Sequence, residues 1–198
     1  GITGSFAVPY MITTLLISYN AITELILPFG GNLGALYAHH NQISSVVGGG
    51  NLQFVDLSYN QLTSLADVSF GPQLHTLNVS NNQLAAMPTN TPTSLTYLTL
   101  SWNQITSVNI LSGTNSLVVD LSHNAIQSMT STGTAHTVVL SFNPLTQGIA
   151  QLGAQLRSLR VSDTQLPCLP YLNSGLQTLY CTNSPINCLP NQPANLNT

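Results

Sequence analysis

The stretch Leu52–Leu65, LQFVDLSYNQLTSL, decides the fold of this chain. Its apolar residues do not follow the roughly 3.6-residue period of a helix. They begin as a strand alternation at Val55 and Leu57, pass a single asparagine, Asn60, and resume at Leu62. A short strand followed by a turn cannot bury its apolar side alone. The stretch therefore predicts that further copies of itself pack on either side.

Copies of this pattern run through nearly the whole chain. The turn position recurs nine times at intervals of 19 to 22 residues, and an isoleucine or leucine always follows it by two. Most turn residues are asparagine, and this structural turn ladder comprises Asn20, Asn41, Asn60, Asn82, Asn103, Asn124 and Asn143. Thr164 and Ser184 occupy the last two turns. Because a hydroxyl makes fewer hydrogen bonds than an amide, we expect looser turns there.

The pattern LxxLxLxxNxLxxL resembles the leucine-rich repeat, and the resemblance covers roughly residues 12–190. The late copies, LRSLRVSDTQLPCLP and LQTLYCTNSPINCLP, look like the LxxLxCxxNxIxxLP variant of secreted bacterial surface proteins. The resemblance implies a mostly-β solenoid of the α/β class. Its parallel concave sheet would hold one strand for each of the nine copies, and its convex side would be irregular with little helix.

We expect one domain over residues 1–198, with a partial repeat over 1–11, nine repeats over 12–190 and a truncated repeat or tail over 191–198. Glycine and proline punctuate the return segments and argue against helices there. Residues 148–156, GIAQLGAQL, are the exception, where we expect a single helical turn. Neither end carries the polar capping repeat that a solenoid needs. This favours a segment of a longer protein with flanking domains, or an array that associates with itself.

Charged residues are scarce, which excludes some partners. The chain has no lysine, two arginines and five acidic residues, for a formal net charge of -3. No basic patch can neutralise phosphates, so we expect no nucleic-acid partner. No apolar run approaches the roughly 18 residues of a membrane span. Mean hydropathy is +0.22, which disfavours disorder in spite of the low charge.

The outward strand positions differ between copies and form the candidate ligand-binding surface of the concave face. These positions are aromatic, histidine or charged: Tyr19, Tyr37, His39, Phe54, Asp56, Tyr59, Tyr97, Trp102, Asp120, His123, Phe142, Arg160 and Tyr180. Large rings with few rotatable bonds suit the recognition of a protein or a glycan. A structural interpretation stays open, in which the rings only shield strand ends and the neighbouring serines are common filler of the repeat.

His39, Ser58 and Asp56 fall close together on this surface and raise the question of a hydrolase or a metal site. A nucleophile needs a base, an orienting group and an oxyanion hole in a cleft poor in water, and an open sheet offers no such cleft. Adjacent histidines on a strand, His39 and His40, point to opposite sides and do not converge on one metal. We therefore expect no enzymatic activity, no cofactor and no metal.

The three cysteines lie near the C-terminal end of the sequence. Cys168 and Cys188 share one position in consecutive repeats, near the Cα separation that a disulfide accepts, and are candidates for a disulfide. Cys181 replaces an inward strand residue and is expected to be a small buried apolar group.

Together these patterns favour a non-enzymatic binding or adhesion module, extracellular or at a cell surface, that recognises a protein or glycan through the concave face. Two alternatives stay open. One is a structural repeat that stacks into a fibre or surface array. The other is ice binding by the ladder of serine and threonine side chains, against which the bulky neighbouring side chains stand. The sequence alone does not name the ligand or the source.

Overall fold

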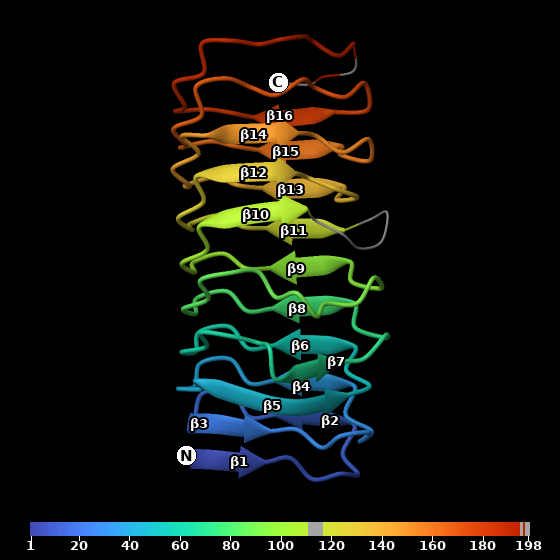
Figure 1. Ribbon diagram of the computed structural model, residues 1–198. Helices are drawn as coiled ribbons and strands as arrows, with labels where there is room; N and C mark the ends of the chain where they lie inside the picture. The colour runs from blue at the N-terminus through green and yellow to red at the C-terminus, as the bar shows by residue number, and fades with distance from the viewer. Residues whose placement is uncertain (111–116, 195, 197–198) are drawn as a thin grey trace. The chain divides into compact units, whose positions relative to one another are not determined.

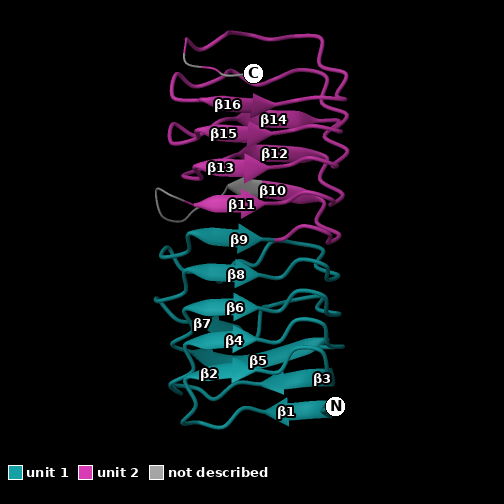
Figure 2. Ribbon diagram, turned by 180° about the vertical axis from the view of Figure 1, so that it is seen from behind, with its two compact units in different colours: residues 1–99 teal, residues 100–198 magenta. Residues whose placement is uncertain are grey.

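The structure, a computed structural model, describes residues 1–110, 117–194 and 196. The described residues form short parallel strands joined by turns and contain no helix. They divide into two compact units, Gly1–Thr99 and Leu100–Thr198, which we call unit 1 and unit 2 (Figure 2). Each unit is a β-solenoid in which successive repeats add one strand beside the last (Figure 1). The prediction of a mostly-β leucine-rich repeat solenoid is confirmed.

Each unit has a first sheet, formed by the strands that precede the turn residues. In unit 1 these strands are β2 (Thr14–Leu16), β4 (Ala35–Tyr37), β6 (Phe54–Asp56), β8 (Thr76–Asn78) and β9 (Tyr97–Thr99). In unit 2 they are β11 (Val118–Asp120), β13 (Thr137–Val139), β15 (Ser158–Arg160) and β16 (Thr178–Tyr180). Within each unit the neighbouring strands pair in parallel and in register, so equivalent residues of successive repeats lie side by side.

Each unit also has a second sheet, formed by strands that follow the turn residues. In unit 1 these are β1 (Thr3–Ala7), β3 (Ala21–Ile26), β5 (Ser45–Gly50) and β7 (Val68–Phe70). In unit 2 they are β10 (Ser107–Ile110), β12 (Ser128–Ser131) and β14 (Gly148–Gln151). Because residues 148–151 are a strand, the helical turn expected over residues 148–156 is wrong. The return segment at residues 111–116 and parts of the expected tail, 191–198, lie outside the described residues.

The second sheet was not predicted because its glycines look like breakers in the sequence. In β5, Gly48 and Gly49 have φ values of 89° and 135°, which side chains rarely allow. A Cβ atom on Gly48 would collide with the carbonyl oxygen of Leu27, and one on Gly49 with that of Ser69. These glycines therefore permit the close approach of three neighbouring strands instead of ending them.

The apolar columns of the repeat form the core between the two sheets. The residues two after the turn are fully buried in successive copies, as at Ile22, Ile43 and Leu62, each 0% exposed. The middle residues of the first-sheet strands, such as Leu36 and Leu77, are also 0% exposed. Burying each of these side chains stabilises the fold by about 2 kcal/mol.

The turn asparagines hydrogen-bond the backbone of two consecutive repeats. At Asn60, Oδ1 accepts the N–H of Ile43 at 2.9 Å, and Nδ2 donates to the carbonyl oxygens of Ala38 and Leu57, both at 3.0 Å. Equivalent bonds occur at Asn41, Asn82, Asn124 and Asn143. The ladder thus satisfies backbone groups that would otherwise be buried without partners.

The last two turns carry a reduced version of this network. The hydroxyls of Thr164 and Ser184 both lie 2.8 Å from the carbonyl oxygen of Val161. The N–H of Thr164 donates to Ser184 Oγ at 3.1 Å. One hydroxyl has a single hydrogen to donate where an amide has two, so these turns hold fewer backbone groups.

Candidate binding face

The residue before each turn position adopts the left-handed backbone conformation. Its φ lies between 53° and 60° in nine repeats, at Tyr19, His40, Tyr59, Asn81, Trp102, His123, Phe142, Asp163 and Asn183. For most residues with a side chain this conformation costs about 1–2 kcal/mol, and it costs less for asparagine, aspartate and histidine. Backbone bonds to the next repeat hold it in place, as where the N–H of His40 donates to the carbonyl of Ser58 at 3.1 Å. The turn therefore dictates the backbone at this position and leaves the side chain free to vary.

Where this side chain is a ring, the rings of successive repeats stack. In unit 1, His40 lies between Tyr19 and Tyr59, with centroids 4.6 and 4.2 Å apart and ring planes within 9° of parallel. The outermost ring, Tyr19, is 73% exposed. Each stacked pair contributes about 0.5–1.5 kcal/mol beyond its buried area. We call these three residues the unit 1 ring stack.

Unit 2 carries an equivalent ring stack. His123 lies between Trp102 and Phe142, with centroids 3.9 and 4.2 Å apart and planes within 10° of parallel. Both outer rings are about half exposed, Trp102 at 55% and Phe142 at 49%. Both stacks therefore hold their rings in fixed orientations at the end of the first sheet while leaving ring edges open to solvent.

The strands of the first sheet add further rings. Tyr37 of β4 stacks on Phe54 of β6, with centroids 4.7 Å apart. In unit 2 the guanidinium of Arg160 lies 4.7 Å from the ring centre of Tyr180, a cation–π contact. Tyr97, which begins β9, is 56% exposed. The first sheet of each unit thus presents aromatic side chains from its strands as well as from its turns.

Two predicted ligand-binding carboxylates are held by the fold itself. Asp56 Oδ1 accepts hydrogen bonds from the N–H and the hydroxyl of Ser58, at 3.0 and 2.7 Å. Asp120 does the same for Ser122, at 2.9 and 2.7 Å. Because the Ser58 hydroxyl donates to Asp56, it is not arranged as a nucleophile with His39 as its base.

The same geometry argues against the serine ladder as an ice-binding surface. Ser58, Ser80 and Ser101 are only 5% to 8% exposed, so these hydroxyls do not present a regular array to solvent. The hydroxyl of Ser80 is bonded to Asn78, as Ser58 is to Asp56. The buried and bonded serines therefore do not favour ice binding through this ladder.

Ser18 shows what happens without such an acceptor. The residue two before it is Leu16, which cannot accept a hydrogen bond, and the buried Ser18 Oγ has no partner. Ser58, Ser80 and Ser122 therefore bond to the side chain two positions earlier, whereas Ser18 does not.

The expectation that His39 and His40 point to opposite sides is wrong. Strand β4 ends at Tyr37, and the left-handed turn at His40 brings the two rings to the same side, with centroids 5.3 Å apart. His40 was also absent from the predicted site, although it occupies the same repeat position as His123. Within the described residues, no three or more histidine, cysteine or acidic side chains are grouped for a metal ion.

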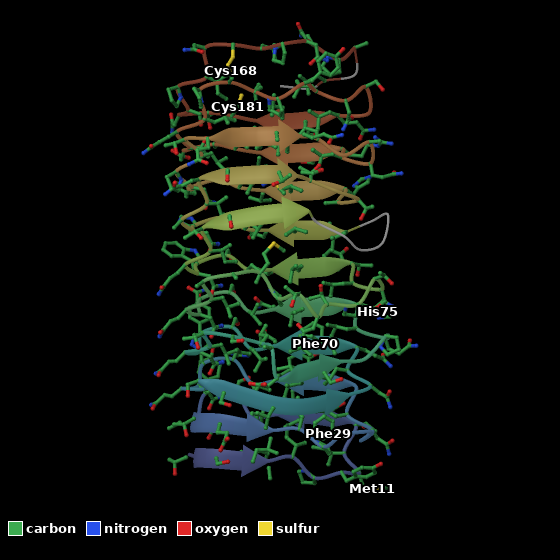
Figure 3. The ribbon with its side chains drawn as sticks, in the orientation of Figure 1. Met11, Phe29, Phe70, His75, Cys168 and Cys181 are labelled. Atoms are coloured by element: carbon green, nitrogen blue, oxygen red, sulfur yellow. A yellow bond between two sulfur atoms is a disulfide. The ribbon has the colours of Figure 1, made fainter. Side chains whose placement is uncertain are left out.

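Cys168 and Cys188 form a disulfide, and their Cα atoms lie 4.9 Å apart. The two residues also form an isolated parallel bridge between successive repeats. Cys181 is not disulfide-bonded and is half-buried rather than buried (Figure 3). The disulfide links the last two repeats, where the turn ladder makes fewer hydrogen bonds.

The predicted residues therefore separate into two groups, one in each unit. Unit 1 holds Tyr19, Tyr37, His39, Phe54, Asp56, Tyr59 and Tyr97, and unit 2 holds Trp102, Asp120, His123, Phe142, Arg160 and Tyr180. The direct ring contacts are those described above, with Tyr19 also meeting His39 edge-on at 5.1 Å. A search for rings at the spacing of the repeat would have added His40.

Comparison with known proteins identifies the repeat. Residues 51–72 match the family described as Leucine Rich Repeat, and residues 91–108 match one described as Leucine Rich repeat. Lumican from Rattus norvegicus is 30% identical over 175 residues, covering 83% of this chain and 47% of lumican. Fibromodulin from Bos taurus is 37% identical over 110 residues, covering 50% of this chain and 29% of fibromodulin. The chain thus spans about half the length of these curated relatives, or less.

Solved structures agree with these matches. YopM from Yersinia enterocolitica WA-314 is 26% identical and superposes with a TM-score of 0.71, covering 94% of this chain and 43% of YopM. YopM from Yersinia pestis, a leucine-rich effector protein, superposes with a TM-score of 0.81 at 22% identity. The match covers 99% of this chain and 56% of YopM. At that lower identity the likeness concerns the fold alone. Repeat pattern, family matches and architecture agree, and the chain is a leucine-rich repeat protein.

Proposed function

We propose that this chain is a non-enzymatic binding or adhesion module of an extracellular or cell-surface protein, and that it recognises a protein or glycan through the outer face of its first sheets. The observation that carries the proposal is the exposed, nearly uncharged row of rings on that face. Membership of the leucine-rich repeat family supports a repeat module built for binding, because stacked repeats create extended surfaces.

The composition of the face suits an interface. Tyrosine, tryptophan and arginine dominate the binding energy of protein interfaces, and the face holds Tyr37, Trp102 and Arg160. The ring stacks and the contact of Arg160 with Tyr180 hold these side chains in place before any ligand arrives. Such preorganisation reduces the entropy cost of binding.

The disulfide supports a location outside the cell. Disulfides persist mainly in oxidising compartments, and Cys168 and Cys188 are bonded. The relatives lumican and fibromodulin share the repeat, whereas the YopM structures belong to an effector protein. No helix of the described residues is long and apolar enough to cross a membrane.

The proposal is tested with a panel of extracellular-matrix proteins and a glycan array, probed with wild-type protein and four variants. Tyr37→Ala and Trp102→Ala each remove a ring from the face. Phe29→Ala and Tyr171→Ala are matched controls, because these rings are 75% and 74% exposed but lie in return segments. We expect a captured ligand to bind at least about tenfold more weakly to a face variant and equally to the controls. A ligand bound equally by all five proteins would refute the proposal.

A further inference from the structure

The second sheet of unit 1 stops at β7, although the chain continues. Its strand order is β1-β3-β5-β7, and β7 has no strand partner on the side away from β5 within unit 1. The next return segment, residues 84–96, lies within the described chain and contains no strand. Pro88 and Pro92 explain this, because proline has no N–H to donate to a strand ladder. The second sheet of unit 1 therefore lacks a strand at this repeat.

Two hollows lie in unit 1 where this strand is missing. One, of about 170 Å³, lies between residues 63–66 and 84–90. The other, of about 320 Å³, runs along β7 and is lined by residues 66–70 with Asn90. Figure 3 marks Phe70, the last residue of β7. A free strand edge beside a hollow is a template for pairing with another extended chain.

One side chain partly replaces the missing strand. Asn90 Nδ2 donates to the carbonyl oxygens of Leu65, at 3.1 Å, and of Val68. Asn90 Oδ1 is buried and has no partner. Asp67 accepts a hydrogen bond from Gly48 of β5, and successive strand residues direct their backbone groups to alternate sides. The N–H and C=O of Phe70, a residue that is 9% exposed, therefore point away from β5.

The charge of unit 1 indicates which kind of chain fits this edge. Both arginines of the protein follow residue 99, so unit 1 contains no arginine or lysine, whereas it holds Glu24, Asp56 and Asp67. Asp56 is bonded to Ser58, but Asp67 lies exposed in the wall of the larger hollow. A basic side chain on an incoming strand would meet this carboxylate.

We propose that the free edge of β7 binds an extended peptide segment by strand addition, and that a lysine or arginine of that segment pairs with Asp67. Main-chain hydrogen bonds to Phe70 supply the strand pairing, and the carboxylate selects a basic sequence. Because β7 is only three residues long, the paired part of the peptide spans about 10 Å. This site lies on the second sheet and is independent of the ligand proposed for the first.

The probe is the peptide acetyl-Lys-Val-Lys-Val-Lys-Val-amide, titrated to millimolar concentration into isotope-labelled protein and followed by amide chemical shifts. We expect saturable shifts at Val68–Phe70 and slower hydrogen exchange at the Phe70 amide. The matched peptide with proline in place of valine keeps the charge but loses half of the backbone donors, so it should not bind. A glutamate-valine peptide should not bind either, because it places carboxylates beside Asp67.

Protein variants separate charge from strand pairing. Asp67→Asn should lower the affinity for the lysine-valine peptide about twofold to fivefold, because an exposed ion pair contributes an energy in that range. Glu24→Gln is the control, because Glu24 lies on β3, which is paired on both sides, and it should bind as the wild type does. The absence of shifts at Val68–Phe70, equal binding of the proline peptide, or equal affinity of Asp67→Asn would each overturn the proposal.

Discussion

The turn ladder makes a quantitative prediction for the Asn60→Ala variant. The substitution removes one acceptor and the amide donor of a residue that is 8% exposed. It leaves the N–H of Ile43 buried without a partner, whereas the carbonyl oxygens of Ala38 and Leu57 keep the side-chain amides of Asn41 and Asn82 as donors. A buried polar group without a partner costs about 1–3 kcal/mol. One orphaned N–H and the lost amide bonds together predict a loss of about 2–3 kcal/mol in the free energy of unfolding.

Asn20→Ala is the matched control. Asn20 is half-buried and makes the same kinds of bond, accepting the N–H of Ile2 at 2.8 Å and donating to the carbonyl of Ile17 at 3.0 Å. Ile2 is 40% exposed, so water can replace the lost bond there, and we expect a cost of about 1 kcal/mol.

Urea unfolding followed by circular dichroism measures both variants against the wild type. The expected loss at Asn60 is a large part of the roughly 5–15 kcal/mol that stabilises a folded domain. Equal losses of unfolding free energy in the two variants, or a loss below about 1 kcal/mol at Asn60, would show that the asparagine ladder does not stabilise the turns.

Four further predictions follow from single contacts. Ser58→Ala should lower the free energy of unfolding by about 1–2 kcal/mol, whereas Ser18→Ala should not lower it, because Ser18 Oγ is buried without a partner; urea titration compares them. Asn81→Val should cost about 2 kcal/mol at its φ of 54°, and Asn81→Gly should cost nothing; a stable valine variant would contradict this. Cys168→Ser should remove about 3 kcal/mol, given the 20-residue separation of the disulfide, and thiol-reducing agents should reproduce the loss in the wild type only. Hydrogen exchange should be faster at the Thr164 amide, bonded to Ser184 Oγ, than at the Leu62 amide, bonded to Asn82 Oδ1; the reverse order would show that the hydroxyl turns are not looser.

The first sheet was predictable because its pattern depends on burial. A strand with Val55 and Leu57 inward and an asparagine three residues later recurs at a fixed interval, and stacking is the way to bury it. The second sheet was not predictable by the same reasoning. In the sequence alone, Gly48 and Gly49 indicate the end of a strand. Only the structure shows that the backbone at Leu27 and Ser69 comes so close that a side chain would not fit there.

The sequence predicts which columns face outward from the first sheet, but not the geometry of their side chains. Reading the column before each turn finds Tyr59 and Trp102, but periodicity does not reveal a left-handed backbone, which depends on bonds between repeats. For this reason the sequence placed His39 and His40 on opposite sides, and it did not show that His40 completes a stack. The bonds of Asp56 and Asp120 to the following serines likewise appear only in three dimensions.

The residues before the turns combine a left-handed backbone conformation with exposed rings. Glycine adopts the left-handed conformation without steric cost, yet none of the nine residues there is glycine. Asn81, Asp163 and Asn183 belong to residue types that tolerate it, as do His40 and His123, and for the four remaining rings it costs about 1–2 kcal/mol each. A stacked pair contributes about 0.5–1.5 kcal/mol beyond the area that it buries, and glycine would lose more conformational entropy on folding, so stacking offsets the backbone cost. The rings are therefore fixed in place at little net cost in stability, and the proposed partner would meet ring edges that need no reordering.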